Sequence, residues 1–129
     1  MLNNSLIEEY QKIIKDKIAK KEYLSASVNA EKFVQNFPDC ELAYYFLGVV
    51  QFWLREYDKS IENSLKAIKI KPDFAKAFYN LGISQYFKGD SDGGIVNITK
   101  AMLLFDRVGD EEAKFKCFDS LKFIKHDLR

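Results

Sequence analysis

A short aromatic motif recurs along this chain at a spacing of 34 residues. Residues 44–48 read Tyr-Tyr-Phe-Leu-Gly, and residues 78–82 read Phe-Tyr-Asn-Leu-Gly. A fainter copy, Tyr-Gln-Lys-Ile-Ile, occupies residues 10–14. A fixed period of this length is typical of stacked-repeat proteins, in which each unit buries its apolar face against the next. Such arrays offer an extended concave surface and seldom a catalytic cleft, so the period favours a binding module.

The boundaries of the repeats follow from helix-breaking residues. Pro38 and Pro72 are expected to end the first and second units, because proline cannot donate to a continuing helix. Gly109 takes this role after the third unit, as a left-handed residue at a helix C-terminus. We therefore expect repeats at about residues 7–40, 41–74 and 75–108, followed by a last helix at about residues 110–128.

Each repeat reads as two amphipathic helices joined by a tight turn. Ser5 and Glu8 fit a capping box, which predicts a helix N-terminus at Ser5. Turns between the two helices are expected at residues 20–22 and 88–90. Asp73 is expected to cap the helix that opens the third repeat.

The repeated residues resemble the tetratricopeptide repeat, whose units share a leading aromatic residue, a Leu-Gly pair and small residues in the second helix. The aromatic position is matched by Tyr10, Tyr44 and Phe78, and the Leu-Gly pair by residues 47–48 and 81–82. The resemblance covers about residues 5–108. It implies one all-α domain over residues 1–129: a right-handed α-solenoid of three helix-turn-helix units with a C-terminal capping helix.

Two departures from this pattern predict differences between the repeats. Ile14 stands where glycine is expected, so the first repeat should pack its helices less closely, with Ala26 and Ala30 making room. Gly93 and Gly94 lie within the second helix of the third repeat. Each should cost about 1 kcal/mol relative to alanine, which predicts that this repeat is the least rigid.

In tetratricopeptide arrays, the face of each first helix that points away from its second helix lines the concave groove. Helical spacing predicts that this face is charged in the first repeat and strongly apolar in the second. The resemblance therefore implies these peptide-binding residues: Lys15, Leu42, Tyr45, Phe46, Val49, Trp53, Lys76, Tyr79, Asn80, Ile83 and Phe87. We expect Phe52 and Tyr86 to lie in the core between neighbouring first helices instead.

Some members of this family bind acidic C-terminal tails of heat-shock chaperones through a clamp of Lys, Asn and Arg residues. Only Lys76 falls at a matching place here, so the clamp is not expected. Lys15 and Lys76 could each still hold one acidic group.

The last predicted helix has more apolar surface than one buried face requires. A stripe at helical spacing contains Ala113, Cys117, Leu121, Ile124 and Leu128, whereas Phe115, Phe118 and Phe123 lie outside or beside it. One interpretation is a cap on the third repeat. The other is that the surplus face contacts the groove or a second subunit.

Composition argues against several other functions. The 20 basic and 19 acidic residues nearly balance, so the charge excess that favours nucleic acid or anionic membranes is missing. The most apolar stretch, residues 43–54, is too short to span a bilayer.

Cys40 and Cys117 have no metal-ligand spacing, and reduced thiols in a cytoplasmic protein are expected. No nucleophile motif, phosphate loop or cofactor-binding motif was found, and His126 near the C-terminus is expected to be solvated.

The sequence therefore predicts a cytoplasmic, non-enzymatic module for protein–protein interaction, without a metal or cofactor. As an adaptor or chaperone it would bind a partly apolar peptide or helix in its groove, as small three-repeat secretion chaperones do. The alternative is an assembly scaffold that self-associates, for example as a homodimer, through its aromatic groove and last helix.

Overall fold

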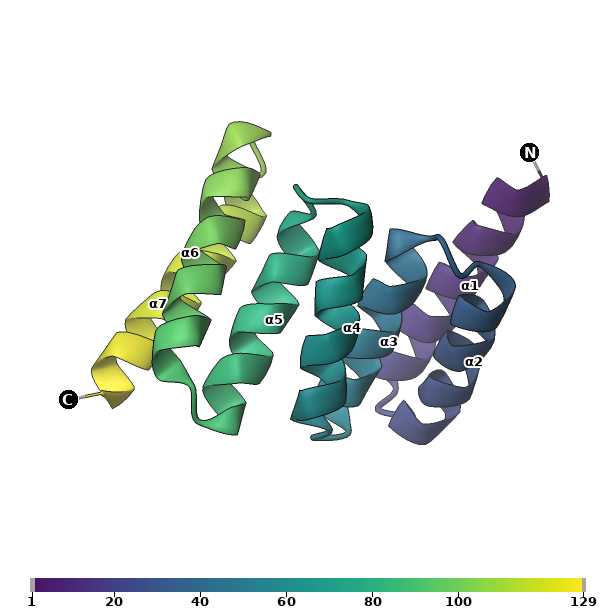
Figure 1. Ribbon diagram of the computed structural model, residues 1–129, viewed down its shortest axis with the longest axis horizontal. Coiled ribbons are helices and arrows are strands. Elements are labelled where there is room, and N and C mark those ends of the chain that lie inside the picture. Colours follow the sequence, from purple (N-terminus) through teal and green to yellow (C-terminus); the bar gives the residue numbers. More distant parts are fainter. Residues whose placement is uncertain (1, 129) are drawn as a thin grey trace.

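The computed structural model describes residues 2–128, which form seven α-helices stacked in chain order along one long axis (Figure 1). The two ends of the chain lie at opposite ends of this stack. The predicted all-α solenoid is therefore confirmed. The helices are α1 (Leu2–Ala19), α2 (Tyr23–Asn36), α3 (Glu41–Trp53), α4 (Tyr57–Ile70), α5 (Ala75–Lys88), α6 (Ser91–Arg107) and α7 (Glu111–Asp127).

The odd-numbered helices share one layer of the stack. Every helix packs on its neighbours in sequence, and α3 also contacts both α1 and α5. Within residues 2–128, no comparable contact joins α2 to α4 or α4 to α6. The odd-numbered helices thus lie closer to one another than the even-numbered helices do, which places α1, α3 and α5 on the concave side.

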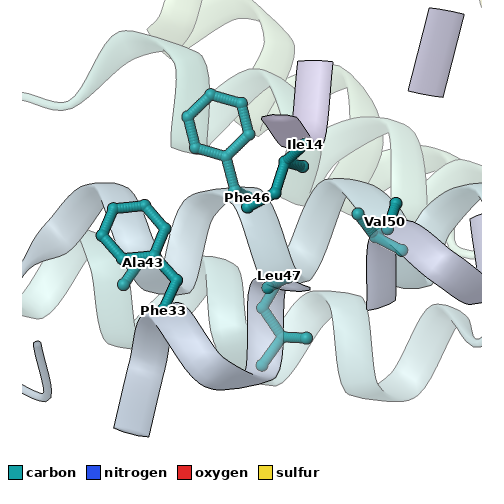
Figure 2. Packing of buried hydrophobic residues seen from close by; sticks show 8 residues of the cluster. Ile14, Phe33, Ala43, Phe46, Leu47 and Val50 are labelled. Carbon is teal, nitrogen blue, oxygen red and sulfur yellow. The ribbon is translucent and has the colours of Figure 1, made fainter. Parts of the chain in front are cut away.

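The first repeat is packed around the isoleucine that replaces the usual glycine. Ile14 is fully buried together with Ala26 and Ala30, whose small side chains leave space for it. Phe33 fills the same cluster and stacks on Tyr10, with ring centroids 4.9 Å apart. Figure 2 shows this cluster continuing into α3. The predicted looser packing of this repeat is confirmed, because α1 and α2 contact each other less extensively than the paired helices of the other repeats do.

In the third repeat, two glycines let the paired helices cross closely. A Cβ atom on Gly82 would lie 2.7 Å from Ile98 Cγ1 and 2.9 Å from the Gly94 carbonyl oxygen. A Cβ atom on Gly94 would likewise lie 2.9 Å from the Gly82 carbonyl oxygen, so the close approach requires glycine at both positions. Gly93 lies in the first turn of α6, where its amide donates to the Asp90 carboxylate at 2.9 Å.

A polar clasp recurs in every repeat and was missed in the sequence. It joins the first helix of each repeat to the second at positions spaced by 34 residues. Its pairs are Lys17 with Asn29 at 2.6 Å, Gln51 with Asn63 at 2.8 Å, and Gln85 with Asn97 at 2.7 Å. Hydrogen bonds at equivalent positions show that the two helices of each repeat meet in the same register at this point.

A buried network of hydrogen bonds connects the second repeat to the third. The Ser60 hydroxyl donates to the Gly48 carbonyl at 2.7 Å and pairs with the Ser84 hydroxyl at 2.8 Å. The Asn80 amide donates to the hydroxyls of Ser60, at 3.0 Å, and Ser64, at 2.9 Å. Such a network fixes the register between α4 and α5, because each buried polar group depends on the others for its partners.

Most predicted helix ends are confirmed, with two exceptions. Gly109 and Gly89 have left-handed φ angles of 76° and 109° and lie just beyond the ends of α6 and α5, as expected for glycine. Ser5, however, lies inside α1 rather than at its start, so the predicted capping box is wrong. The Asp73 cap is also wrong, because Phe74 is the residue before α5 and no side chain caps this helix.

The C-terminal helix α7 packs on α6 through the predicted apolar stripe. Cys117, Leu121 and Ile124 are buried in one cluster with Phe78 and Phe105. The prediction that Leu128 belongs to this stripe was wrong, because Leu128 follows the end of α7 and is 56 % exposed.

Candidate binding groove

The concave side holds a pocket of about 360 Å³ between α3, α5 and α7. Every predicted groove residue except Lys15, Leu42 and Phe46 contributes to its wall. The pocket is lined by Tyr45, Val49, Phe52, Trp53, Lys76, Tyr79, Asn80, Ile83, Phe87 and Lys116. Helical geometry explains this grouping, since residues three or four apart in α3 and α5 lie on one face of each helix.

One edge of the groove is a continuous row of aromatic rings. Trp53 stacks on Tyr23 of α2 at 5.6 Å between centroids, and Phe52 meets Phe87 edge-to-face at 5.5 Å. Phe52 and Trp53 contact each other at 5.4 Å, so the row continues from α2 to α5 without a break. Trp53 is 47 % exposed and Phe87 is 53 % exposed. These rings hold one another in place and still present apolar surface to a ligand.

The groove continues beyond this pocket toward the other end of the helices. Tyr45 and Lys76 also line a neighbouring pocket of about 350 Å³, whose wall includes Leu42 and Phe46. Lys15 lies further away, in a shallow charged depression on α1. Its ammonium nitrogen is 5.8 Å from the centre of the Phe46 ring. The predicted residues thus follow one surface, with Lys15 at its margin.

Two predicted groove residues are buried, which corrects the expectation that they are accessible. Phe46 is only 5 % exposed and belongs to the core cluster around Ile14 (Figure 2). Asn80 is 7 % exposed, and its amide nitrogen is already committed to Ser60 and Ser64. Both errors have one cause. Phe46 and Asn80 occupy the same repeat position, and this position packs against the preceding repeat.

Two residues of the pocket were not predicted. Phe52 was assigned to the core between first helices, but it lines the pocket. Lys116 comes from α7, for which the repeat motif offers no register. Tyr86 was also assigned to the core, but it is only half-buried at the edge of the cluster around Phe78, and its hydroxyl donates to the Asp127 carboxylate of α7.

The pocket is positively charged and its tyrosines are neutral. Among the residues that the structure describes, Lys76 and Lys116 are the only charged ones in its wall, and the Lys116 ammonium lies 5.0 Å from the centre of the Tyr79 ring. Burial raises the pKa of Tyr45 to about 12 and also raises the pKa of Tyr79. The Tyr79 hydroxyl pairs with Ser120 of α7 at 2.7 Å. At neutral pH the groove therefore offers apolar surface, neutral phenols and two cations.

Comparison with known proteins supports the repeat assignment. Residues 55–89, which span α4 and α5, match the TPR repeat family. The resemblance to tetratricopeptide repeat proteins is thus confirmed, and the chain folds as three such units with an additional C-terminal helix. A search of curated proteins gave no match.

Solved structures with the same fold include SycD, PcrH and a yeast Sti1 domain. The type III secretion translocator chaperone SycD of Yersinia enterocolitica is 13% identical with a TM-score of 0.85, covering 97% of this chain and 96% of that one. PcrH in complex with the chaperone-binding region of PopD is 11% identical with a TM-score of 0.84, covering 98% and 96%. The TPR2B domain of yeast Sti1 in a pHsp70 complex is 17% identical with a TM-score of 0.83, covering 95% and 98%. Likeness at these identities establishes the fold.

Two structural features are absent from residues 2–128. None of the described helices combines the length and apolar composition needed to cross a bilayer. Within the same range, no group of three or more His, Cys, Asp or Glu side chains is arranged to hold a metal ion.

Proposed function

We propose that this protein is a peptide-binding adaptor or chaperone that holds a partly apolar segment of another protein in its concave groove. The observation that carries the proposal is the aromatic pocket between α3, α5 and α7, with Trp53 and Phe87 about half exposed. Burying a large apolar side chain stabilises a complex by roughly 1.5–3 kcal/mol, so a few contacts here suffice for binding.

The related structures support the same reading of the groove. PcrH was solved with the chaperone-binding region of PopD, and the Sti1 domain was solved in a complex with pHsp70. We infer that the corresponding surface of this chain also receives a polypeptide. The binding residues we propose are Leu42, Tyr45, Val49, Phe52, Trp53, Lys76, Tyr79, Ile83, Phe87 and Lys116, with Lys15 at the margin. We propose further that residues 1–129 act as one domain and that the protein is cytoplasmic, as expected for its free thiols Cys40 and Cys117.

Selection from a random peptide library tests this function directly. A phage-displayed library of dodecapeptides is panned on the immobilised protein and, in parallel, on Phe87→Asp. The wild type should enrich apolar sequences, and the enriched peptides should lose binding to Phe87→Asp, because a carboxylate in the aromatic row disfavours apolar side chains.

The matched control is Leu103→Asp. Leu103 lies on α6 outside the groove and is 58 % exposed, so this variant should retain the enriched peptides. Circular dichroism verifies that both variants stay helical. Failure of the wild type to enrich any sequence, or equal loss of binding in both variants, would overturn the proposed function.

Self-association is a second candidate, which the exposed phenylalanines of α7 favour. Phe115, Phe118 and Phe123 are 61 %, 50 % and 63 % exposed. One of the similar SycD structures is described as an alternative dimer. A two-fold contact would bury the same patch twice. If this patch forms a homodimer, light scattering should show twice the monomer mass for wild type and the monomer mass for Phe115→Ser/Phe118→Ser. A monomeric wild type at all concentrations removes this candidate.

A further inference from the structure

We propose that the groove selects segments in which an acidic side chain lies next to the apolar anchor, and that Lys116 of α7 binds this acid together with Lys76 of α5. This inference rests on the proposed function and specifies the chemistry of the partner. It also makes α7 part of the binding site, in addition to its role in closing the solenoid.

The two lysines converge on the same wall of the groove. Both line the main pocket, and both line a smaller pocket of about 140 Å³ beside it. The Tyr79 side chain of α5 lies against α7 and lines both pockets. The Lys116 ammonium nitrogen is 5.0 Å from the centre of the Tyr79 ring. The bond from the Tyr79 hydroxyl to Ser120 fixes α7 against α5 at this point. The position of Lys116 is thereby set by the fold.

Within the described residues, Lys76 and Lys116 carry a local excess of positive charge in the two pockets they share. Neither lysine forms an ion pair, whereas Lys59, Lys66, Lys88 and Lys114 all do. No Asp or Glu lines either of the two pockets that the lysines share. Lys76 also lines the next pocket along the groove, whose wall contains Asp73 and Asp110 as well as Lys71, so its charge is partly offset on that side. The excess positive charge is therefore local to the Lys76–Lys116 wall, although the whole chain is nearly neutral.

The neighbouring surface determines where the acid must lie in the partner. Val49, Ile83 and Phe87 form an apolar wall of the same pocket that contains both lysines. A ligand that fills this wall with an aliphatic or aromatic side chain brings its adjacent residues to the lysines. A carboxylate there gains a charge-assisted contact, and a ligand cation would be repelled. The complementary partner is thus an apolar residue flanked by Asp or Glu.

This arrangement differs from the clamp by which some tetratricopeptide repeat proteins bind acidic chaperone tails. The clamp draws its cations and amides from the first helices of three repeats, and Phe46 and Val49 occupy two of its places here. Asn80 at another place is buried and bound to serines. The second cation instead comes from the extra helix.

The experiment uses the dodecapeptides enriched on the full-length protein. Their sequences are determined, and one enriched peptide is titrated against the wild type, Lys76→Gln/Lys116→Gln and the matched control Lys69→Gln/Lys122→Gln. Both control lysines are exposed and line none of the pockets described above. Binding is followed by the fluorescence of Trp53, which is the only tryptophan and lines the pocket.

We expect Asp or Glu within two positions of the apolar anchor in most enriched peptides. The groove variant should bind such a peptide about threefold to thirtyfold more weakly at low salt, the range for losing two partly exposed ion pairs. The control should bind as the wild type does. Replacing the acid of the peptide by its amide should produce the same loss and cancel the effect of the lysine variant. Circular dichroism establishes that both double variants are folded.

Two kinds of failure are distinguishable. Enriched apolar peptides without acids, or equal affinity of the groove variant and the wild type, overturn this inference and leave the proposed function intact. Absence of any enriched peptide overturns the proposed function and this inference with it.

Discussion

Polar side chains between paired helices contribute to the specificity of this fold. The polar clasps Gln51–Asn63 and Gln85–Asn97 lie at the same repeat positions as Lys17–Asn29, where lysine takes the place of glutamine. Gln51 and Asn63 are both buried, whereas Lys17 is half-buried and its ammonium can turn to water. The cost of breaking a clasp should therefore depend on the repeat in which it lies.

Asn63→Ala should lower the free energy of unfolding by about 1–3 kcal/mol, because it leaves the buried Gln51 oxygen without its donor. Asn29→Ala should change it by less than about 0.5 kcal/mol, the usual range for surface positions. Urea denaturation followed by circular dichroism measures both. Equal losses in the two variants would show that burial of the clasp does not govern its contribution.

The glycines at the helix crossings differ in how much space they leave. A Cβ atom on Gly48 would approach Asn80 and Ser60 to 3.2 and 3.3 Å, whereas one on Gly82 would approach Ile98 to 2.7 Å. Alanine gains about 1 kcal/mol of helix propensity at either site, and overpacking costs about 1–3 kcal/mol. Gly82→Ala should therefore be clearly destabilising and Gly48→Ala close to neutral in thermal unfolding. The reverse order would contradict the packing of the third repeat.

Burial of two ionisable groups predicts a loss of stability at high pH. The pKa of Tyr45 rises from 10.0 to about 12 on folding, and the pKa of Cys117 from 9.0 to about 11, both through desolvation. Because the folded state holds these protons more tightly, the stabilisation is complete below pH 9 and is lost as pH rises through about 11 to 12. Urea unfolding at a series of pH values should show this decline. Tyr45→Phe should make it shallower, and an unchanged slope would contradict the assignment to Tyr45.

The helix α7 combines a buried face with an exposed one. Leu121 is 6 % exposed against α6, whereas Phe118 on the same helix is 50 % exposed at the open end of the solenoid. Leu121→Ala should lower the free energy of unfolding by about 2–5 kcal/mol, because it leaves a cavity. Phe118→Ala should change it by about 0.5 kcal/mol or less. Equal effects in chemical denaturation would mean that α7 docks differently.

The sequence predicted the helices that carry the repeat motif better than α7, which lacks it. The ends of the second and third repeats followed from Pro38, Pro72 and Gly109, and the groove faces of α3 and α5 followed from the family resemblance together with helical spacing. The position of Lys116 did not, because α7 carries no copy of the motif. Its register depends on α6, which has 17 residues where α4 has 14, and on the turn at Gly109.

The errors within the repeats arose from packing between units. Helical spacing places Phe46 and Asn80 on the outward face of their helices, but it does not show how far the preceding repeat covers that face. Ile14 and the rest of its cluster enclose Phe46, and Ser60 and Ser64 enclose Asn80. The polar clasps left a signal in the sequence, because Asn29, Asn63 and Asn97 recur at the 34-residue period. They were missed because the period alone does not show that each asparagine faces the first helix of its own repeat.

The groove forms because the stack of helices is curved. Contacts among α1, α3 and α5 bring their outward faces together, and α7 extends this layer through Tyr79 and Ser120. The aromatic row from Tyr23 to Phe87 lies along this surface and stays partly exposed. A protein with such a surface is expected to cover it with a partner.

The location of a bound peptide tests this account most directly. The ¹⁵N-labelled protein is titrated with one library-enriched peptide, and backbone amide shifts are followed by NMR. We predict that the largest changes occur on the concave faces of α3, α5 and α7, around Val49, Ile83 and Lys116. Changes centred instead on Phe115 and Phe118, or on the outer faces of α2, α4 and α6, would contradict the claim that the concave groove is the binding site.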